Sequence, residues 1–299
     1  MIAQKINYII GLMLIILLSS CEKDIKIQSS NLPPKLVVDA TIENNEQPFV
    51  TLSKSLNYFD KLSLTQLQNS FENNAIVTIS NGTRSIILRE YAIPISGGVI
   101  YVYAPNFNAD TTFKGQLGKA YSLNIKTTNG NIYNATTTIP QLRKRVDSLR
   151  WEKAPPIIAD TNRRIIYGRF FEPTPLGDYV RVFTKVNSEP FYFAGNSVYD
   201  DIFVDGSSYE FKIDRNYSRV VPTNDEYRDF YTRGDTVTLK TSNIDKPSYD
   251  FWRTLEFSIA NIGNPFGSPI TVQSNITGSP ALGVFTGYAS QYKTIIIPQ

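Results

Sequence analysis

Three groups of side chains in this 299-residue sequence could carry chemistry. They are a lone thiol at Cys21, an acidic cluster of Asp200, Asp201 and Asp205, and a stretch rich in tyrosine, phenylalanine and arginine at 225–233. No histidine is present, so the commonest metal ligand and the commonest general base near neutral pH are both missing. The sequence therefore favours a protein that is not an enzyme and that uses no cofactor.

The thiol of Cys21 follows a basic start and an apolar run over residues 8–18, which is the pattern of a secretory signal peptide. The run is too short to span a bilayer, which takes about 20 residues. Residues 18–20, a leucine and two serines, match the bacterial lipobox, in which the thiol is alkylated by a diacylglyceryl group and the chain is cut just before it. We therefore predict a signal peptide over 1–20 and lipid attachment at Cys21; an ordinary signal peptide with a chance cysteine is the alternative.

The segment that follows the thiol, residues 21–34, is polar and ends in two prolines, so we expect a tether between the lipid and the folded body. Charged residues at 22–24 act in some Gram-negative groups as a signal for export to the cell surface, and a solvated spacer is an equally good interpretation. The expected location is the outer membrane, with the leaflet left open. The formal net charge of +3 is too small to indicate a nucleic-acid partner.

Short β-branched runs bounded by turn residues predict a mainly β protein. Asn-Gly pairs at 81–82 and 129–130 each separate two such runs and predict two β-hairpins, because both residue types tolerate positive φ. Seven or so strands within about a hundred residues are typical of an immunoglobulin-like β-sandwich. We expect that sandwich over residues 35–140.

The second half, residues 141–299, is more aromatic and predicts an antiparallel β barrel or sandwich with one short helix. The helix is expected near 246–260, with Asp245 as its N-cap and an apolar stripe that only Glu256 interrupts. The boundary between the halves falls at a basic run, residues 141–145, which indicates a solvated linker more readily than a contact with lipid headgroups.

The acidic cluster of Asp200, Asp201 and Asp205 offers carboxylates to calcium. Its spacing matches no EF-hand loop, and Asp-Gly at 205–206 is also an ordinary turn, so these residues are weak candidates and a solvated turn is the simpler interpretation. No metal site is predicted beyond them.

Aromatic side chains gather in the second half and suit either a β core or a partly wet platform for sugars or an apolar ligand. Their members are Phe191, Tyr192, Phe193, Tyr199, Tyr227, Phe230 and Tyr231. Three of them, Tyr227, Phe230 and Tyr231, form a candidate partner contact together with the neighbouring Arg228, because tyrosine and arginine are enriched at interface hot spots. An exposed loop or a short helix is the alternative.

Short segments spread over the chain resemble, by their order and spacing, a family of Bacteroidetes-type outer-membrane lipoproteins known as domain of unknown function 4249. They are KLVVDATI (35–42), VTLSKS (50–55), YF (58–59), AIVTIS (75–80), GKAYSL (118–123), GDTVT (234–238), YDFW (249–252), NPF (264–266), SNI (274–276) and GVF (283–285). The resemblance implies a lipoprotein facing the periplasm or the cell surface, often encoded beside a TonB-dependent receptor. It implies no catalytic residue.

These observations lead to one main expectation and two rivals. We expect a non-enzymatic binding or accessory lipoprotein that works with a TonB-dependent receptor in nutrient capture. A structural or adhesive surface protein is the first rival, and a hydrolase that uses paired carboxylates is the second.

Overall fold

The computed structural model describes residues 33–56, 63–95, 98–110, 112–218, 225–264, 267–268 and 270–299. Pro34–Leu56 and Asp60–Gln299 form one unit, and the description below concerns that unit. The predicted signal peptide (1–20), Cys21 and most of the tether (21–34) lie outside the described residues. In the described ranges, no helix combines the length and apolar character needed to cross a membrane.

The described chain is mainly β, as the sequence predicts, and it contains two helices. The elements in chain order are β1 (Leu36–Glu43), β2 (Phe49–Lys54), α2 (Leu64–Asn69), β3 (Ile76–Ser80), β4 (Ser85–Ile95), β5 (Gly98–Ala104), β6 (Ala120–Lys126), β7 (Ile132–Thr138), β8 (Arg145–Lys153), β9 (Arg163–Phe171), β10 (Tyr179–Val186), β11 (Val198–Tyr199), β12 (Ser208–Ile213), β13 (Tyr231–Thr232), β14 (Thr236–Ile244), α3 (Lys246–Ala260), β15 (Thr277–Gly278) and β16 (Ala281–Ile296).

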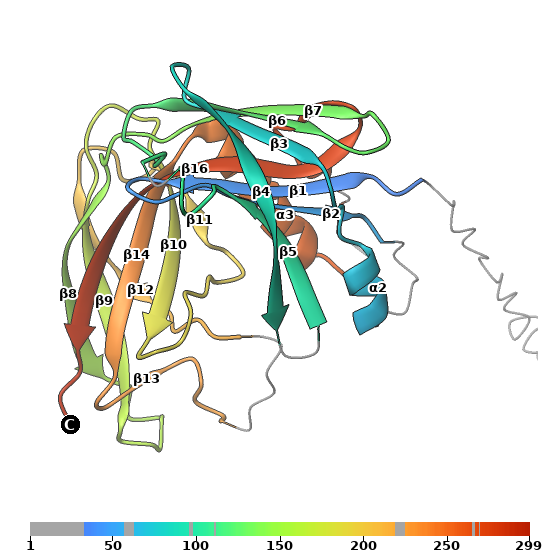
Figure 1. The fold of residues 1–299 in the computed structure, drawn as a ribbon. Coiled ribbons are helices and arrows are strands. Elements are labelled where there is room, and N and C mark those ends of the chain that lie inside the picture. The colour runs from blue at the N-terminus through green and yellow to red at the C-terminus, as the bar shows by residue number, and fades with distance from the viewer. Residues whose placement is uncertain are drawn as a thin grey trace, which may run out of the picture. The chain divides into compact units, whose positions relative to one another are not determined.

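Twelve of these strands form one mixed sheet in the order β11-β10-β14-β16-β1-β2-β5-β4-β3-β6-β7-β15 (Figure 1). Both expected hairpins are present, since β3 pairs with β4 and β6 pairs with β7. Their turns contain Gly82 and Gly130 at φ +86° and +87°, the left-handed region that glycine enters without a steric penalty. The Asn-Gly signal therefore predicted two local pairings correctly.

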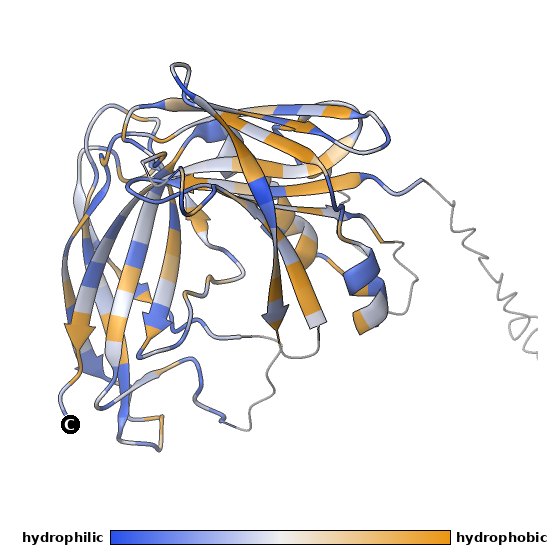
Figure 2. Cartoon of the chain, viewed as in Figure 1, coloured by the Kyte–Doolittle hydropathy of each residue, from blue (hydrophilic) through white to orange (hydrophobic). Residues whose placement is uncertain are grey.

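The first core lies where this sheet folds over itself, so that β1, β2 and the start of β16 face β3, β4, β6 and β7 (Figure 1). Apolar and polar residues alternate along these strands (Figure 2), and β6 shows the pattern most clearly because Tyr121, Leu123 and Ile125 are buried while their neighbours are exposed. This layering confirms a sandwich in the first half. Phe285 and Ala289 of β16 belong to the same core, although they lie far along the chain from residues 35–140.

The second core lies between β10 and β14 of the large sheet and a smaller sheet of β8, β9, β12 and β13. Its buried residues include Ile166, Phe170, Val182 and Leu239. Within the described residues neither sheet closes on itself, so of the two predicted alternatives for this half the sandwich is correct and the barrel is wrong.

Strand β16 joins the two halves because it changes partner along its length. Residues 281–288 pair in parallel with β1, and residues 289–296 pair antiparallel with β14. Asn44 lies at the changeover, where its side-chain oxygen accepts a hydrogen bond from the Ser290 amide at 2.5 Å. The predicted boundary at 140/141 falls between β7 and β8, while β16 contributes to the cores on both sides of it.

Helix α3 begins and ends where the sequence predicts. Asp245 caps it by accepting a hydrogen bond from the Ser248 amide at 3.1 Å. The short helix α2 was not expected, although Ser63 and Gln66 form a capping box that the sequence contains.

Candidate functional site

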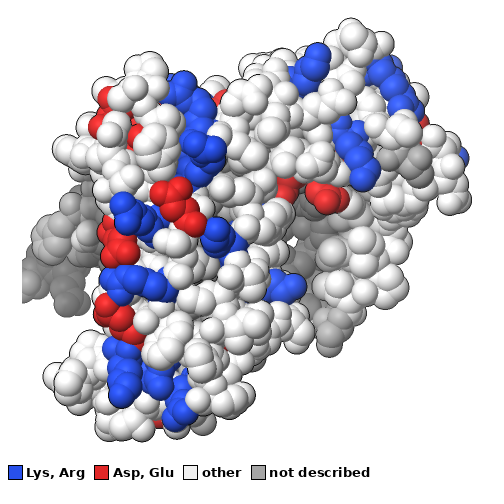
Figure 3. All heavy atoms as spheres, turned by 90° about the vertical axis from the view of Figure 1, so that its left-hand side faces the viewer, with Lys and Arg blue, Asp and Glu red and all other residues white. Residues whose placement is uncertain are grey.

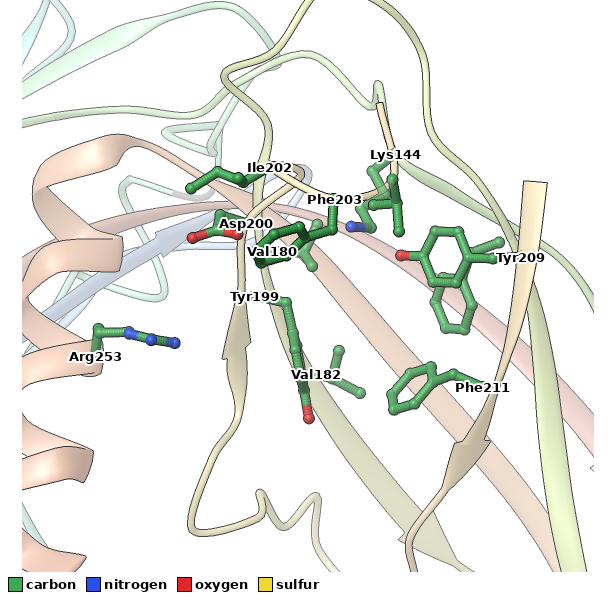
Figure 4. Close-up of a pocket in the computed structure, with 12 residues that line it drawn as sticks. Lys144, Val180, Val182, Tyr199, Asp200, Ile202, Phe203, Tyr209, Phe211 and Arg253 are labelled. Carbon is green, nitrogen blue, oxygen red and sulfur yellow. The ribbon is translucent and has the colours of Figure 1, made fainter. Parts of the chain in front are cut away.

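A cavity of about 460 Å³ lies in the second half of the protein (Figure 4). Strands β9, β10, β11 and β12, helix α3 and the loop after β11 all contribute to its walls. Its lining residues are Lys144, Phe170, Val180, Val182, Tyr199, Asp200, Ile202, Phe203, Val204, Tyr209, Phe211 and Arg253. This volume falls within the range of small-molecule sites, roughly 300–1,000 Å³.

The walls are apolar because two strands present alternate residues to the same side. Val180 and Val182 are two residues apart on β10, and Tyr209 and Phe211 are two residues apart on β12. The ring of Tyr209 stacks on that of Phe170, with centroids 5.7 Å apart and planes inclined by 16°. These strands are fixed by their own sheets, so the cavity is built into the fold.

Lys144 is the charged group that lies deepest in this site. The residue is 1% exposed, and its ammonium nitrogen lies 2.5 Å from the Oε2 atom of Glu172. Its backbone exchanges two hydrogen bonds with the Asn243 side chain, at 3.0 and 3.1 Å. Burial alone would lower the pKa of Lys144, but hydrogen bonds to Glu172 and Tyr209 outweigh it and hold the pKa above its ordinary value. Lys144 is therefore a fixed ammonium on the cavity wall.

This position corrects the prediction for residues 141–145. A solvated linker and a headgroup contact both require exposed side chains, whereas Lys144 is buried and Arg143 pairs with Asp178 at 3.0 Å. Two buried carboxylates bind Lys144 and Arg143, whereas Gln141 and Arg145 at the ends of the run are exposed. Sequence reasoning treated these basic residues as solvated, because nothing near them in the chain indicates their partners Glu172 and Asp178.

An acidic group lies behind the cavity and only partly matches the calcium candidates. Within the described residues the carboxylates that come together are Glu172, Asp178 and Asp201, with oxygens within 4.8 Å of one another. Asp201 is 2% exposed and accepts hydrogen bonds from the amides of Gly177 and Asp178 at 2.7 and 2.9 Å. Lys144 and Arg143 pair with Glu172 and Asp178, so two of the three carboxylates already have a cation from within the chain.

The other two calcium candidates lie elsewhere. Asp200 accepts a hydrogen bond from the Tyr249 hydroxyl at 2.8 Å, and Asp205 is exposed on the loop. The acidic group within the described residues contains only Asp201 of the predicted trio, so Asp200, Asp201 and Asp205 do not form one site.

The mouth of the cavity combines apolar and charged side chains. Ile202 and Phe203, on the loop after β11, are 63% and 95% exposed. Arg253 reaches from α3 toward Val182 and Tyr199 (Figure 4). Exposed apolar residues beside a concave apolar surface are typical of a ligand-binding or partner-binding rim.

A buried polar network holds the elements that frame the mouth. Glu256, the one interruption of the α3 stripe, accepts hydrogen bonds from the amide and the hydroxyl of Ser197. Arg181 donates to the same hydroxyl at 3.1 Å, and its guanidinium carbon lies 3.4 Å from the ring centroid of Trp252. This network attaches α3 to β10 and to the start of β11, so Arg253 and Tyr199 are held by rigid neighbours.

The candidate partner contact is only partly exposed. Tyr231 is 1% exposed and donates from its hydroxyl to the Asp214 carbonyl at 3.0 Å, so it belongs to the second core and cannot contact a partner. Tyr227, Arg228 and Phe230 are half-buried, and each takes part in a cation–ring contact within the chain. The error at Tyr231 arises because local composition does not reveal which ring of an aromatic run is directed inward.

The outer face of the smaller sheet is charged but mixed in sign. Lys and Arg side chains alternate with Asp and Glu on this side of the molecule (Figure 3). The pairs there include Arg150 with Glu210 and Lys212 with Asp214, each at 2.9 Å. Exposed pairs of this kind contribute little to stability, and the face is a solvated surface.

The structure combines a mainly β body with a preformed cavity whose walls are mostly apolar. The chain belongs to the family described as Domain of unknown function (DUF4249), whose model matches residues 22–294. This agrees with the resemblance noted from the sequence. A search of the curated proteins gives no match.

Proposed function

We propose that this protein is a non-enzymatic, lipid-anchored binding protein of the outer membrane that holds a small apolar ligand and works beside a TonB-dependent receptor in nutrient capture. The observation that carries the proposal is the cavity, whose walls are mostly apolar and whose strands are fixed by the two sheets. Burying an apolar surface is the main favourable term in binding such a ligand.

Binding is favoured over catalysis by the state of the polar groups in the cavity. Lys144 is paired with Glu172 and keeps its proton, so it supplies no base. Burial raises the pKa of Tyr199 to about 12 and raises that of Tyr209, so both phenols stay neutral near pH 7. A general base with a pKa near the working pH is what acid–base catalysis requires, and none of these groups meets that requirement.

The anchor and the receptor rest on the sequence rather than on the fold. The lipobox at residues 18–21 supports attachment to a membrane, and the sequence's resemblance to lipoproteins often encoded beside TonB-dependent receptors supports such a receptor as the partner. An exposed apolar rim at Ile202 and Phe203 supports a handover surface beside the cavity.

The receptor is tested by affinity purification from native membranes with a tag at the C-terminus, read by mass spectrometry. A TonB-dependent receptor recovered in near-equal amount supports the proposal. Recovery of the bait alone, or of copies of the same chain, contradicts the transport role and favours the adhesive alternative.

The cavity is tested separately with N-phenyl-1-naphthylamine, a neutral apolar fluorophore. We expect its fluorescence to rise on binding, and Val204→Trp, which adds bulk on the partly exposed loop that lines the cavity, to abolish the rise. The matched control is Val102→Trp on β5, also partly exposed and outside the cavity lining. Equal fluorescence with both variants would contradict a ligand site at this position.

A further inference from the structure

We infer that the cavity selects amphipathic anions, molecules with an apolar body and a carboxylate that pairs with Arg253 at the mouth. This inference rests on the proposed binding function and specifies the chemical class of its ligand. It rests on the partners and the exposure of the three charged residues that line the cavity, Lys144, Asp200 and Arg253.

Two of these charges are already engaged. Lys144 pairs with Glu172 at 2.5 Å and is almost completely buried. Asp200 accepts a hydrogen bond from Tyr249 at 2.8 Å. Arg253 differs from both, because it is exposed and forms no ion pair with any residue of the described ranges. Asp200 keeps its negative charge, because Tyr249 is a neutral donor, but it is half-buried, so the more accessible charge at the cavity is positive.

The position of Arg253 sets the orientation of such a ligand. Its guanidinium points from α3 across the cavity toward Val182 and Tyr199, while Lys144 and Tyr209 lie at the opposite end (Figure 4). An anionic head at Arg253 would leave the apolar body to extend over Val182 toward Phe211. A guanidinium presents two parallel N–H donors that match the two oxygens of a carboxylate, which favours this head over a neutral hydroxyl.

A cationic ligand fits these groups less well. The carboxylate that faces the cavity, Asp200, is half-buried and shares its oxygen with Tyr249. The carboxylates behind the wall, Glu172 and Asp178, already face Lys144 and Arg143. A ligand cation would also lie near the guanidinium of Arg253, which is more exposed than the carboxylate of Asp200.

The inference is tested by displacing bound N-phenyl-1-naphthylamine with three probes of equal chain length. Decanoate and decyltrimethylammonium are used below their micelle concentrations, and decan-1-ol is used below its solubility limit. We expect decanoate to bind about tenfold more tightly than decan-1-ol, the size of one charge-assisted hydrogen bond at a partly exposed site. Arg253→Gln should remove that difference by weakening the binding of decanoate about tenfold. Arg89→Gln, which removes an exposed arginine of β4 outside the cavity, should change neither.

Each outcome separates the inference from the proposed function. Equal affinities for decanoate and decan-1-ol in the unmodified protein, tighter binding of the ammonium probe, or an unchanged preference in Arg253→Gln would overturn the inference while the cavity still binds apolar molecules. If the fluorophore itself does not bind, the proposed function fails and the inference fails with it.

Discussion

Replacing Lys144 with methionine is the sharpest test of the electrostatics behind the cavity. Methionine keeps most of the side-chain length and removes the ammonium, which leaves the carboxylate of Glu172 buried without its nearest cation. The side chains of Lys144 and Glu172 are 2% and 0% exposed, so solvent cannot replace the lost charge. Breaking a buried ion pair from one side costs about 3–5 kcal/mol, and we expect that loss in the free energy of unfolding at pH 7.

The loss of unfolding free energy in Lys144→Met should increase as the pH rises. Burial raises the pKa of Glu172 above its ordinary 4.5, and Lys144 opposes that rise. Without Lys144 the pKa rises further. A carboxyl whose pKa is higher in the folded state contributes stability that is present below its unfolded value and is lost as pH increases through the folded value. The gap between Lys144→Met and the unmodified protein should therefore widen from pH 4 to pH 7.

Urea unfolding followed by intrinsic fluorescence at both pH values measures the gap. The matched control is the double variant Lys144→Met with Glu172→Met, which removes both charges. It should recover to within about 1–2 kcal/mol of the unmodified protein, because replacing a whole buried pair by apolar groups is often close to neutral. A single variant that loses less than about 1 kcal/mol at pH 7, or the same gap at both pH values, would refute a buried ion pair at this position.

Three further predictions concern stability and titration. Gly283→Ala should lower the free energy of unfolding in urea by about 2–5 kcal/mol, because Gly283 has φ +108° and the new Cβ would lie 1.9 Å from the Val38 carbonyl oxygen. The control Gly177→Ala, at φ +123°, should cost less, because its new Cβ meets no atom within 4 Å. Asp245→Ala should lower the unfolding free energy by about 1–2 kcal/mol, as the loss of an N-cap does, and a loss below 0.5 kcal/mol would count against it. Burial raises the pKa of Tyr199 to about 12, so Tyr199→Phe should leave the tyrosinate absorbance unchanged up to about pH 11; an earlier difference would contradict that burial.

Local patterns predicted the elements of this protein well. Short β-branched runs predicted a mainly β protein, Asn-Gly pairs located two hairpins, and helix α3 follows Asp245 as expected. Each of these features depends on neighbouring residues, so the information lies within a few positions of the chain. Pairing between distant strands is different, and nothing near residues 281–288 indicates that they run parallel to β1.

The candidate site was harder to predict for the same reason. Its lining comes from segments between Lys144 and Arg253 that are separated by many residues. Tyr199 was among the aromatic candidates, but Lys144 lay in a basic run and its partner Glu172 follows an aromatic strand 28 positions later. A buried lysine is recognisable only when the carboxylate that stabilises it is known to be close.

The change of partner along β16 affects the order in which the chain can fold as it is synthesised. This strand follows all the others along the chain, yet it pairs with β1, the first of them. Pairing over such a sequence distance makes folding slow. A chain that emerges N-terminus first from a ribosome or a secretion channel exposes the edges of β1 and β14 until residues 281–296 arrive. Unpaired edges of this kind promote aggregation, so the incomplete chain is protected only when chaperones cover these edges or when its last strand has been added.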